Sequence, residues 1–167
     1  ACVPCPAPAA AAGSLFETRR LFTGYQTDAE DAAELLLDGG GQLVSIMSGK
    51  QTQKMAAYLI RKAEVRVVLT AYTFDLKFVT DALKAAQEKW VEVVVITDHG
   101  HAISGATNSM MDRLSELQDS GIQVFLLKGL SGTGGIQHSK TLLCDEHVII
   151  GSCNWTNSSR SNQEIST

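Results

Sequence analysis

A histidine and a lysine stand two residues apart in residues 137–145, where the chain reads Gln-His-Ser-Lys-Thr-Leu-Leu-Cys-Asp. On an extended segment, residues two apart point to the same side, so His138 and Lys140 are expected to project together while Ser139 faces away. The segment has the pattern H-x-K-x4-D, which ends at Asp145, and it holds an imidazole and an ammonium side by side.

A second group of polar residues follows closely. Gly151, Ser152 and Asn154 form a glycine turn that presents a hydroxyl and an amide, both of which can bind phosphate oxygens. Glu164 comes ten residues after Asn154. Its carboxylate can accept a proton from one imidazole nitrogen and leave the other nitrogen free to attack phosphorus.

Helices and strands alternate before these motifs, with a period of roughly thirty residues. The apolar pattern predicts helices over 50–62 and 75–89, a third helix that ends at Gly121, and strands over 65–70, 91–97 and 122–127. After a loop at 130–135, two short strands are expected at 139–144 and 147–150, joined at Asp145-Glu146. Such alternation is typical of crossover units. We therefore expect an α/β fold with a mixed, largely parallel sheet flanked by helices on both faces.

The length of 167 residues suits a single domain. Residues 1–13 are rich in alanine, hold all three prolines and are expected to be a low-complexity tail, which leaves 14–167 as the domain. Within it, 14–22 could hold a short strand, and the acidic stretch 28–38 ends at three glycines. The net charge of −4 excludes an overall basic field, so any site for a polyanion must be local.

The four cysteines do not form the pattern of a disulfide-rich secreted protein, which favours an intracellular location. Cys2 and Cys5 make a C-x-x-C pair without the further ligands that a zinc site needs, so no metal is expected. Cys144 and Cys153 are expected to pack in the interior. No apolar run is long enough to span a membrane, although an upstream anchor can have been removed.

The motifs resemble those of the phospholipase D superfamily. The matched positions are His138, Lys140 and Asp145 for H-x-K-x4-D, Gly151, Ser152 and Asn154 for G-S-x-N, and Glu164 for the glutamate beyond. The resemblance covers roughly residues 50–164 and includes the aromatic segment 71–74 and the strand that ends at Asp98. In its short, single-motif format the chain is similar to bacterial endonucleases of the Nuc type and to the mitochondrial cardiolipin hydrolase and Zucchini group.

The chain also departs from the family pattern. Five residues separate Asp145 from Gly151 where the family usually has six, and Cys153 stands where relatives often carry a bulkier apolar residue. Relatives generally continue past the position of Thr167 through another strand and a helix, so the chain is expected to be truncated. The zinc finger and membrane anchor of the cardiolipin hydrolase group are not visible. A location at the mitochondrial outer membrane is expected only if an anchor has been removed.

The resemblance implies a two-step reaction that needs no metal and no cofactor. His138 would form a phosphohistidine, and the equivalent histidine of a second motif would protonate the leaving oxygen. Lys140 and Asn154 would neutralise the phosphate oxygens, Ser152 would help fix the phosphate, and Glu164 would orient a histidine. Asp145 is expected to brace the strands. Because the chain has one motif, a two-fold homodimer is expected to supply the other.

Three functions remain open. Nucleic acid, either DNA or RNA, is the first substrate, because residues 121–143 hold no acidic side chain and Lys128 adds positive charge. A phospholipid such as cardiolipin is the second, with Leu126, Leu127 and Leu130 as an apolar rim. The third is a catalytically inactive binding scaffold, if the shortened gap or missing terminus disables the site.

The remaining histidines have no motif of their own. His147, His99 and His101 are interpreted as structural, although His99 and His101 follow a strand end and can line the cleft. The eight basic residues between Lys50 and Lys89, against four acidic ones, are interpreted as a solvated helical face that can also form a phosphate track.

Overall fold

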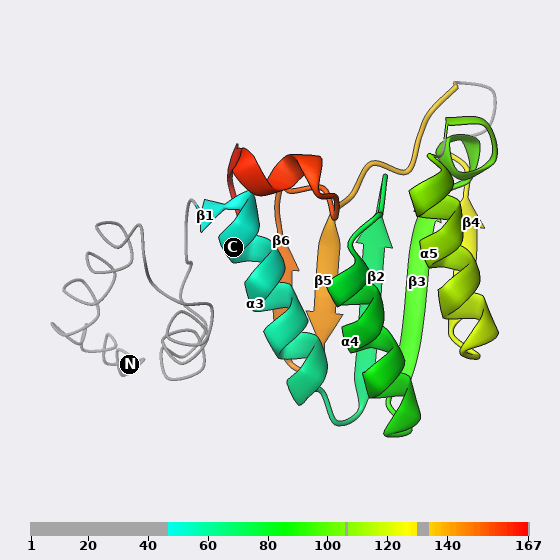
Figure 1. Cartoon of the computed structure of the whole chain (residues 1–167). Helices are drawn as coiled ribbons and strands as arrows, with labels where there is room; N and C mark the ends of the chain where they lie inside the picture. Colours follow the sequence, from blue (N-terminus) through cyan, green and yellow to red (C-terminus); the bar gives the residue numbers. More distant parts are fainter. Residues whose placement is uncertain (1–46, 106, 130–133, 167) are drawn as a thin grey trace, which may run out of the picture.

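The computed structural model describes residues 47–105, 107–129 and 134–166 (Figure 1). Its helices are α3 (Gly49–Lys62), α4 (Lys77–Glu88), α5 (Asn108–Asp119) and the short turns η1 (His101–Gly105) and η2 (Ser158–Ser161). Its strands are β1 (Met47–Ser48), β2 (Arg66–Ala71), β3 (Glu92–Asp98), β4 (Gln123–Leu127), β5 (Thr141–Cys144), β6 (His147–Ile150) and β7 (Gln163–Glu164). The predicted helices and strands from residue 50 onward are confirmed. The expected tail 1–13, strand 14–22 and acidic stretch 28–38 lie outside the described residues.

Five strands form one mixed sheet in the order β4-β3-β2-β5-β6. β2, β3 and β4 are parallel neighbours, whereas β5 is antiparallel to β2 and to β6. The α/β class and the mixed sheet are confirmed. Four of the five strands, β2, β3, β4 and β6, run in the same direction and β5 runs opposite to them, so the largely parallel character is confirmed as well.

The three long helices lie side by side on one face of the sheet, with α4 between α3 and α5 (Figure 1). The chain moves from β2 through α4 to β3 and through α5 to β4, always in one direction across the sheet. Right-handed crossovers that all proceed in one direction place their helices on the same face. Within the described residues, the three long helices therefore flank the sheet on one of its faces.

Side chains that point toward the helices form the core. In β2, β3 and β5 alternate residues are buried against α3, α4 and α5, among them Val67, Leu69, Val93, Val95 and Leu142. The other face of the sheet is apolar but more exposed: the side chains of Phe125, Leu127, Val148 and Ile150 are between 45% and 51% accessible. In the part of the chain that the structure describes, no helix has the length and hydropathy needed to cross a membrane.

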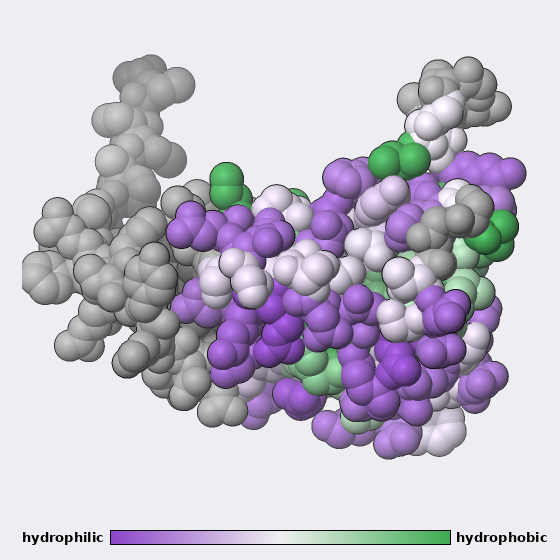
Figure 2. Space-filling view, turned by 45° about the horizontal axis from the view of Figure 1, so that its top comes forward, coloured by the Kyte–Doolittle hydropathy of each residue, from purple (hydrophilic) through white to green (hydrophobic). Residues whose placement is uncertain are grey.

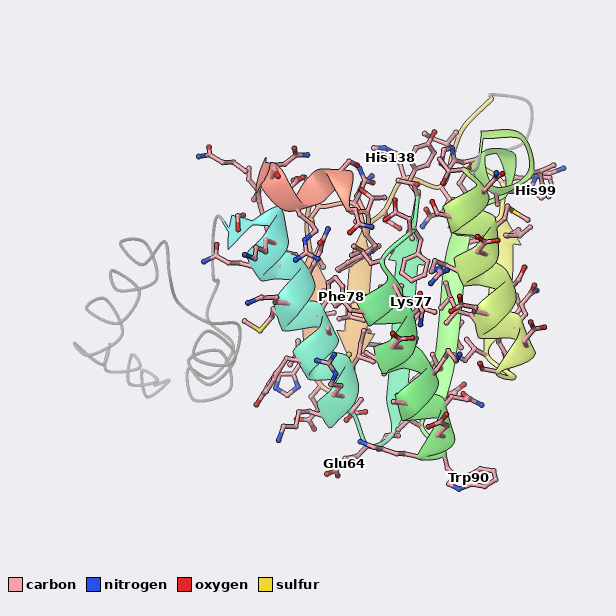
Figure 3. All side chains as sticks on the ribbon, in the orientation of Figure 1. Glu64, Lys77, Phe78, Trp90, His99 and His138 are labelled. Carbon is pink, nitrogen blue, oxygen red and sulfur yellow. The ribbon has the colours of Figure 1, made fainter. Side chains whose placement is uncertain are left out.

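Helix α4 ends in an unusual way. Trp90, the second residue after its last turn, has a φ of 68°, and its side chain is 95% exposed (Figure 3). This left-handed position after a helix normally holds glycine, because a Cβ atom there is strained. Because the indole of Trp90 is almost fully exposed, it gains little packing energy that could compensate for this strain.

Replacing Trp90 by glycine is therefore expected to raise the free energy of unfolding by about 0.5–1 kcal/mol, after the greater freedom of glycine in the unfolded chain is allowed for. Urea denaturation measures the change. Trp90→Ala is the matched control, because it removes the same side chain and keeps the Cβ strain, and it should leave stability nearly unchanged. Equal stability of the two variants would contradict the strain argument.

Candidate active site

All the predicted site residues except Asp145 come together at one end of the sheet, where β2 and β3 end and β5 begins. His138 lies at this end in Figure 3, three residues before the first residue of β5. The carboxyl ends of parallel strands are the usual place for ligand sites in open α/β sheets. Here the sheet brings Ala71, at the end of β2, and Asp98, at the end of β3, to the same edge.

His138 and Lys140 both lie beside Tyr72, the residue that follows β2. The ring centroids of Tyr72 and His138 are 4.9 Å apart, and Lys140 Nζ lies 5.7 Å from the centroid of the tyrosine ring. Lys140 Nζ also donates a hydrogen bond of 2.6 Å to the carbonyl oxygen of His138. Ser139 instead bonds sideways to Thr70 Oγ1 at 3.0 Å. The structure therefore places the imidazole and the ammonium around one aromatic ring.

The two groups differ in their access to solvent. His138 is exposed, whereas the side chain of Lys140 is buried, with 6% of its surface accessible. Burial lowers the pKa of Lys140 below its ordinary value, and attraction to the carboxylate of Glu164 works in the opposite direction. The exposed imidazole of His138 thus lies next to the buried ammonium of Lys140. Because water reaches this ammonium poorly, its interaction with an anion is stronger than it would be at the surface.

Asp98 holds two loops at the edge of the site. Its carboxylate accepts hydrogen bonds from the backbone N–H of His101 at 2.6 Å and from that of Gln137 at 2.8 Å. Burial alone would raise the pKa of the Asp98 carboxyl, but these two hydrogen bonds and the nearby charge of His101 lower it overall. Asp98 thereby fixes the segment that carries His138 against the end of β3.

Ser152 and Glu164 form a hydrogen-bonded pair beside Lys140. Ser152 Oγ donates to Glu164 Oε2 and accepts from the backbone N–H of Ile165 at 3.2 Å, and Asn162 Nδ2 donates to Glu164 Oε1 at 3.1 Å. Glu164 is 7% exposed. Within the described residues Glu164 makes no hydrogen bond to His138, and its expected role in orienting a histidine stays a prediction.

Asn154 is positioned by a glutamine that the sequence did not reveal. Gln53 of α3 is fully buried, and its Nε2 donates to the carbonyl oxygens of Asn154 at 3.0 Å and Thr156 at 2.9 Å. The side-chain Oδ1 of Asn154 is itself buried and has no hydrogen-bond partner among the described residues. A glutamine among the mostly apolar buried residues of α3 was the only sequence signal for this clamp.

Trp155 ties the same loop to the sheet. Its side chain is 1% exposed, and its Nε1 donates a hydrogen bond of 2.8 Å to the carbonyl oxygen of Thr70. The Asp75 carboxylate accepts from the backbone N–H of Asn157 at 2.7 Å. The loop that carries Ser152 and Asn154 is therefore attached to α3, to β2 and to the segment before α4.

Asp145 is not part of this group. It follows β5, at the end of the sheet where Glu64 lies in Figure 3 and opposite His138. Its carboxylate accepts hydrogen bonds from the backbone N–H groups of Arg66 at 2.8 Å, Glu64 at 2.9 Å and Val65 at 3.0 Å. Asp145 connects the β5–β6 turn to the start of β2. This geometry does not support a catalytic role for Asp145.

Replacing Asp145 by asparagine is expected to lower the free energy of unfolding by about 1–3 kcal/mol at neutral pH, because charge-assisted hydrogen bonds are lost. The N–H groups of Arg66, Glu64 and Val65 lower the pKa of Asp145 below 3.8. Its contribution is therefore complete above pH 3.8 and is lost as the pH falls through the lowered value. Urea unfolding at several pH values should show the gap to wild type closing in acid. Glu146→Gln, an exposed neighbour, should show no such gap at neutral pH.

The remaining candidates have structural surroundings. Cys144 and Cys153 are buried free thiols, and burial raises the pKa of the first to about 12 and of the second to about 11, so their packing role is confirmed. His147 begins β6 near Asp145, away from His138. Among the described residues, no cluster of three or more histidine, cysteine, aspartate or glutamate side chains has the arrangement of a metal site.

Comparisons with known proteins relate the chain to one family. The family described as "Cardiolipin synthase, PLD-like domain" matches residues 57–167. A curated protein named "Phospholipase D" from Rickettsia prowazekii is 32% identical over 104 residues, which cover 62% of this chain and 46% of that protein. The chain thus spans about half the length of the curated relatives that it matches.

Solved structures show the same fold. Nuc from Salmonella typhimurium, a phospholipase D family member, has a TM-score of 0.63 at 22% identity, over 72% of this chain and 76% of that chain. NucT from Helicobacter pylori has a TM-score of 0.64 at 22% identity, over 73% of this chain and 81% of that chain. Together with the match of the family model to most of the chain, these likenesses lead to one conclusion: the chain belongs to the phospholipase D superfamily.

Proposed function

We propose that the protein is a metal-independent phosphodiesterase that cleaves nucleic acid through a phosphohistidine intermediate. One observation carries the proposal: an exposed His138 stands beside the buried cation of Lys140, next to the Ser152–Glu164 pair. A ring nitrogen of His138 attacks phosphorus, an N–P bond forms, and the P–O bond to the leaving group breaks. Water then attacks phosphorus and breaks the N–P bond.

The reaction needs a second histidine, which protonates the leaving oxygen and later takes the proton of the attacking water. A further H-x-K-x4-D motif is absent from the sequence. Since His138 is exposed at the end of the sheet, a second copy related by a two-fold axis can present its own His138 to the same phosphate. We therefore propose a homodimer with one composite site.

Lys140 and Asn154 are proposed to offset the charge on the phosphate oxygens, and Ser152 to help hold the phosphate. Glu164 is attracted to Lys140 and is bonded by Ser152 and Asn162, so its direct role in this chain is to fix these side chains. Asp145 is given a structural role only.

Nucleic acid is the favoured substrate because the site end of the molecule is polar. Figure 2 brings this end forward and shows mainly hydrophilic residues, with hydrophobic ones in small separate patches. Lys128 is exposed at the end of β4, and residues 121–143 add no negative charge. A local positive approach of this kind suits a polyanionic strand.

A phospholipid is the second candidate, favoured by a specific observation. Leu126, Leu127 and Ile136 are 38%, 47% and 52% exposed, and all belong to segments that border the site end. Apolar side chains at such a rim can enter a lipid surface. Leu130, which the sequence predicts as part of this rim together with Leu126 and Leu127, lies outside the described residues. The names of the matching family and of the Rickettsia relative are consistent with this alternative.

Cleavage assays in excess EDTA decide between these functions. Labelled single- and double-stranded DNA and RNA and cardiolipin-containing vesicles are each incubated with the wild type and with His138→Ala. EDTA-resistant cleavage of a nucleic acid that disappears in the variant supports the proposal. Cleavage of cardiolipin alone would favour the lipid function, and a folded dimer without activity on any substrate would favour an inactive scaffold.

A further inference from the structure

An aromatic ring connects two histidines at the edge of the site. The imidazole of His101 stacks on Tyr72, with centroids 4.6 Å apart and planes inclined by 27°. The same tyrosine ring lies 4.9 Å from the imidazole of His138, at a tilt of 59°. The side chains of Tyr72 and His101 are partly exposed. One ring therefore separates the proposed nucleophile from a second imidazole that solvent reaches.

The position of His101 is built into the fold. The backbone N–H of His101 bonds to one carboxylate oxygen of Asp98, while the other oxygen holds the N–H of Gln137, next to His138. Asp98 is 2% exposed, so this link lies in the interior. The buried carboxylate of Asp98 thus fixes the position of the loop that carries His101 relative to the loop that carries His138.

The surroundings of His101 suit a cation. A stacked aromatic ring attracts a protonated imidazole through its face, and the charge of Asp98 interacts favourably with that of His101. Lys140 Nζ lies over the same tyrosine ring. A structural histidine needs no outward face, yet this one remains accessible beside two other groups that carry or acquire positive charge.

We propose that His101 binds a phosphate adjacent to the one that His138 attacks, so that Tyr72 separates two phosphate subsites. The inference rests on the proposed function and deepens it, because it names a polyanion with neighbouring phosphodiesters as the preferred substrate. Adjacent phosphates of a strand are separated by one sugar, which is similar in size to the ring of Tyr72. The flanking phosphate accepts a hydrogen bond from the imidazole of His101.

Tetranucleotides test this subsite. Each contains three linkages, and the linkage on the 5′ or on the 3′ side of the central one is replaced by an uncharged methylphosphonate, so that the central phosphodiester loses one charged neighbour and keeps the other. The kcat/KM for cleavage of the central linkage in each isomer and in the natural tetranucleotide is measured in EDTA for wild type, His101→Gln and His99→Gln. His99 follows β3 on the same loop and points away from His138 in Figure 3, which makes it the matched control.

For wild type, the central linkage of one of the two methylphosphonate isomers should be cleaved about tenfold more slowly than that of the natural tetranucleotide, and that of the other isomer nearly as fast. His101→Gln should lose a similar factor on the natural tetranucleotide and nothing further on the sensitive isomer, because the interacting charge is already absent. His99→Gln should behave like wild type.

Three outcomes would overturn the inference. Equal losses for His101→Gln on all three substrates would mean that His101 acts only through the position of Tyr72. Sensitivity to removal of the flanking base, rather than of the flanking charge, would indicate base stacking. If the wild type cleaves no oligonucleotide, the proposed function itself fails, whereas cleavage without any methylphosphonate effect removes the subsite alone.

Discussion

Replacing His138 by alanine is expected to lower kcat/KM for phosphodiester cleavage by about 10⁴-fold or more, because the variant loses the atom that bonds to phosphorus. The composite site would lose its acid as well, since the same residue of the second copy supplies it. His138 is exposed, so its removal leaves no cavity, and the thermal unfolding midpoint should stay within a few degrees of wild type. His147→Ala, at the other end of the sheet, serves as the control that keeps activity.

Mixing the two proteins tests whether the site is shared. If each dimer has one site with two copies of His138, an equimolar, fully exchanged mixture of wild type and His138→Ala should retain about one quarter of the activity of the same total amount of wild type. Activity close to one half would show that each chain works alone and would contradict the composite site. Subunit exchange can be followed with a tag on one of the two proteins.

Replacing Lys140 by methionine is expected to lower kcat/KM by about 10²–10³-fold while leaving the protein folded, because one buried charge next to the phosphate is lost. Methionine fills nearly the same volume, and the wild-type ammonium is held there against its own desolvation. Lys128→Met removes an exposed cation from the approach instead and should reduce activity only a few-fold, mostly at low salt. Equal losses in the two variants would contradict a specific role for Lys140.

The same substitution has a pH-dependent effect on stability. The pKa of Lys140 is lowered in the folded protein from 10.5, so the folded state releases this proton before the unfolded state does as the pH rises. Since the unfolded state then binds more protons, wild type should gain stability relative to Lys140→Met as the pH increases toward 10.5. The free energy of unfolding in urea, measured for both proteins at several alkaline pH values, checks the sign. A gap that is constant with pH would contradict the burial argument.

Much of the fold could be predicted because each strand of the five-stranded sheet is rich in β-branched and apolar residues. The local sequence alone predicts a buried strand at Val67 and Leu69 and another at Val93 and Val95, because such apolar runs need no information about tertiary contacts. The face covered by the helices could not be predicted in the same way. It depends on the spatial order of the strands, and the order β4-β3-β2 places both crossovers on one side.

Only the site residues that belong to a sequence motif could be predicted. His138, Lys140, Ser152, Asn154 and Glu164 follow from spacing, and the structure brings them to one end of the sheet. The contacts of Tyr72 and the clamp made by Gln53 join segments that are far apart in the sequence. A polar residue in an apolar helix face or an aromatic residue at a strand end has many explanations, so only the tertiary contacts identified these roles.

The two tryptophans give the protein a spectroscopic consequence. Trp155 belongs to the loop that carries Ser152 and Asn154, and it is buried and bonded to β2, so its fluorescence should be blue-shifted and should respond when that loop changes. Trp90 is 95% exposed and emits like an indole in water, which masks that signal. The Trp90→Gly variant, chosen above for its effect on stability, is therefore also a single-tryptophan protein whose emission reports ligand binding without any added label.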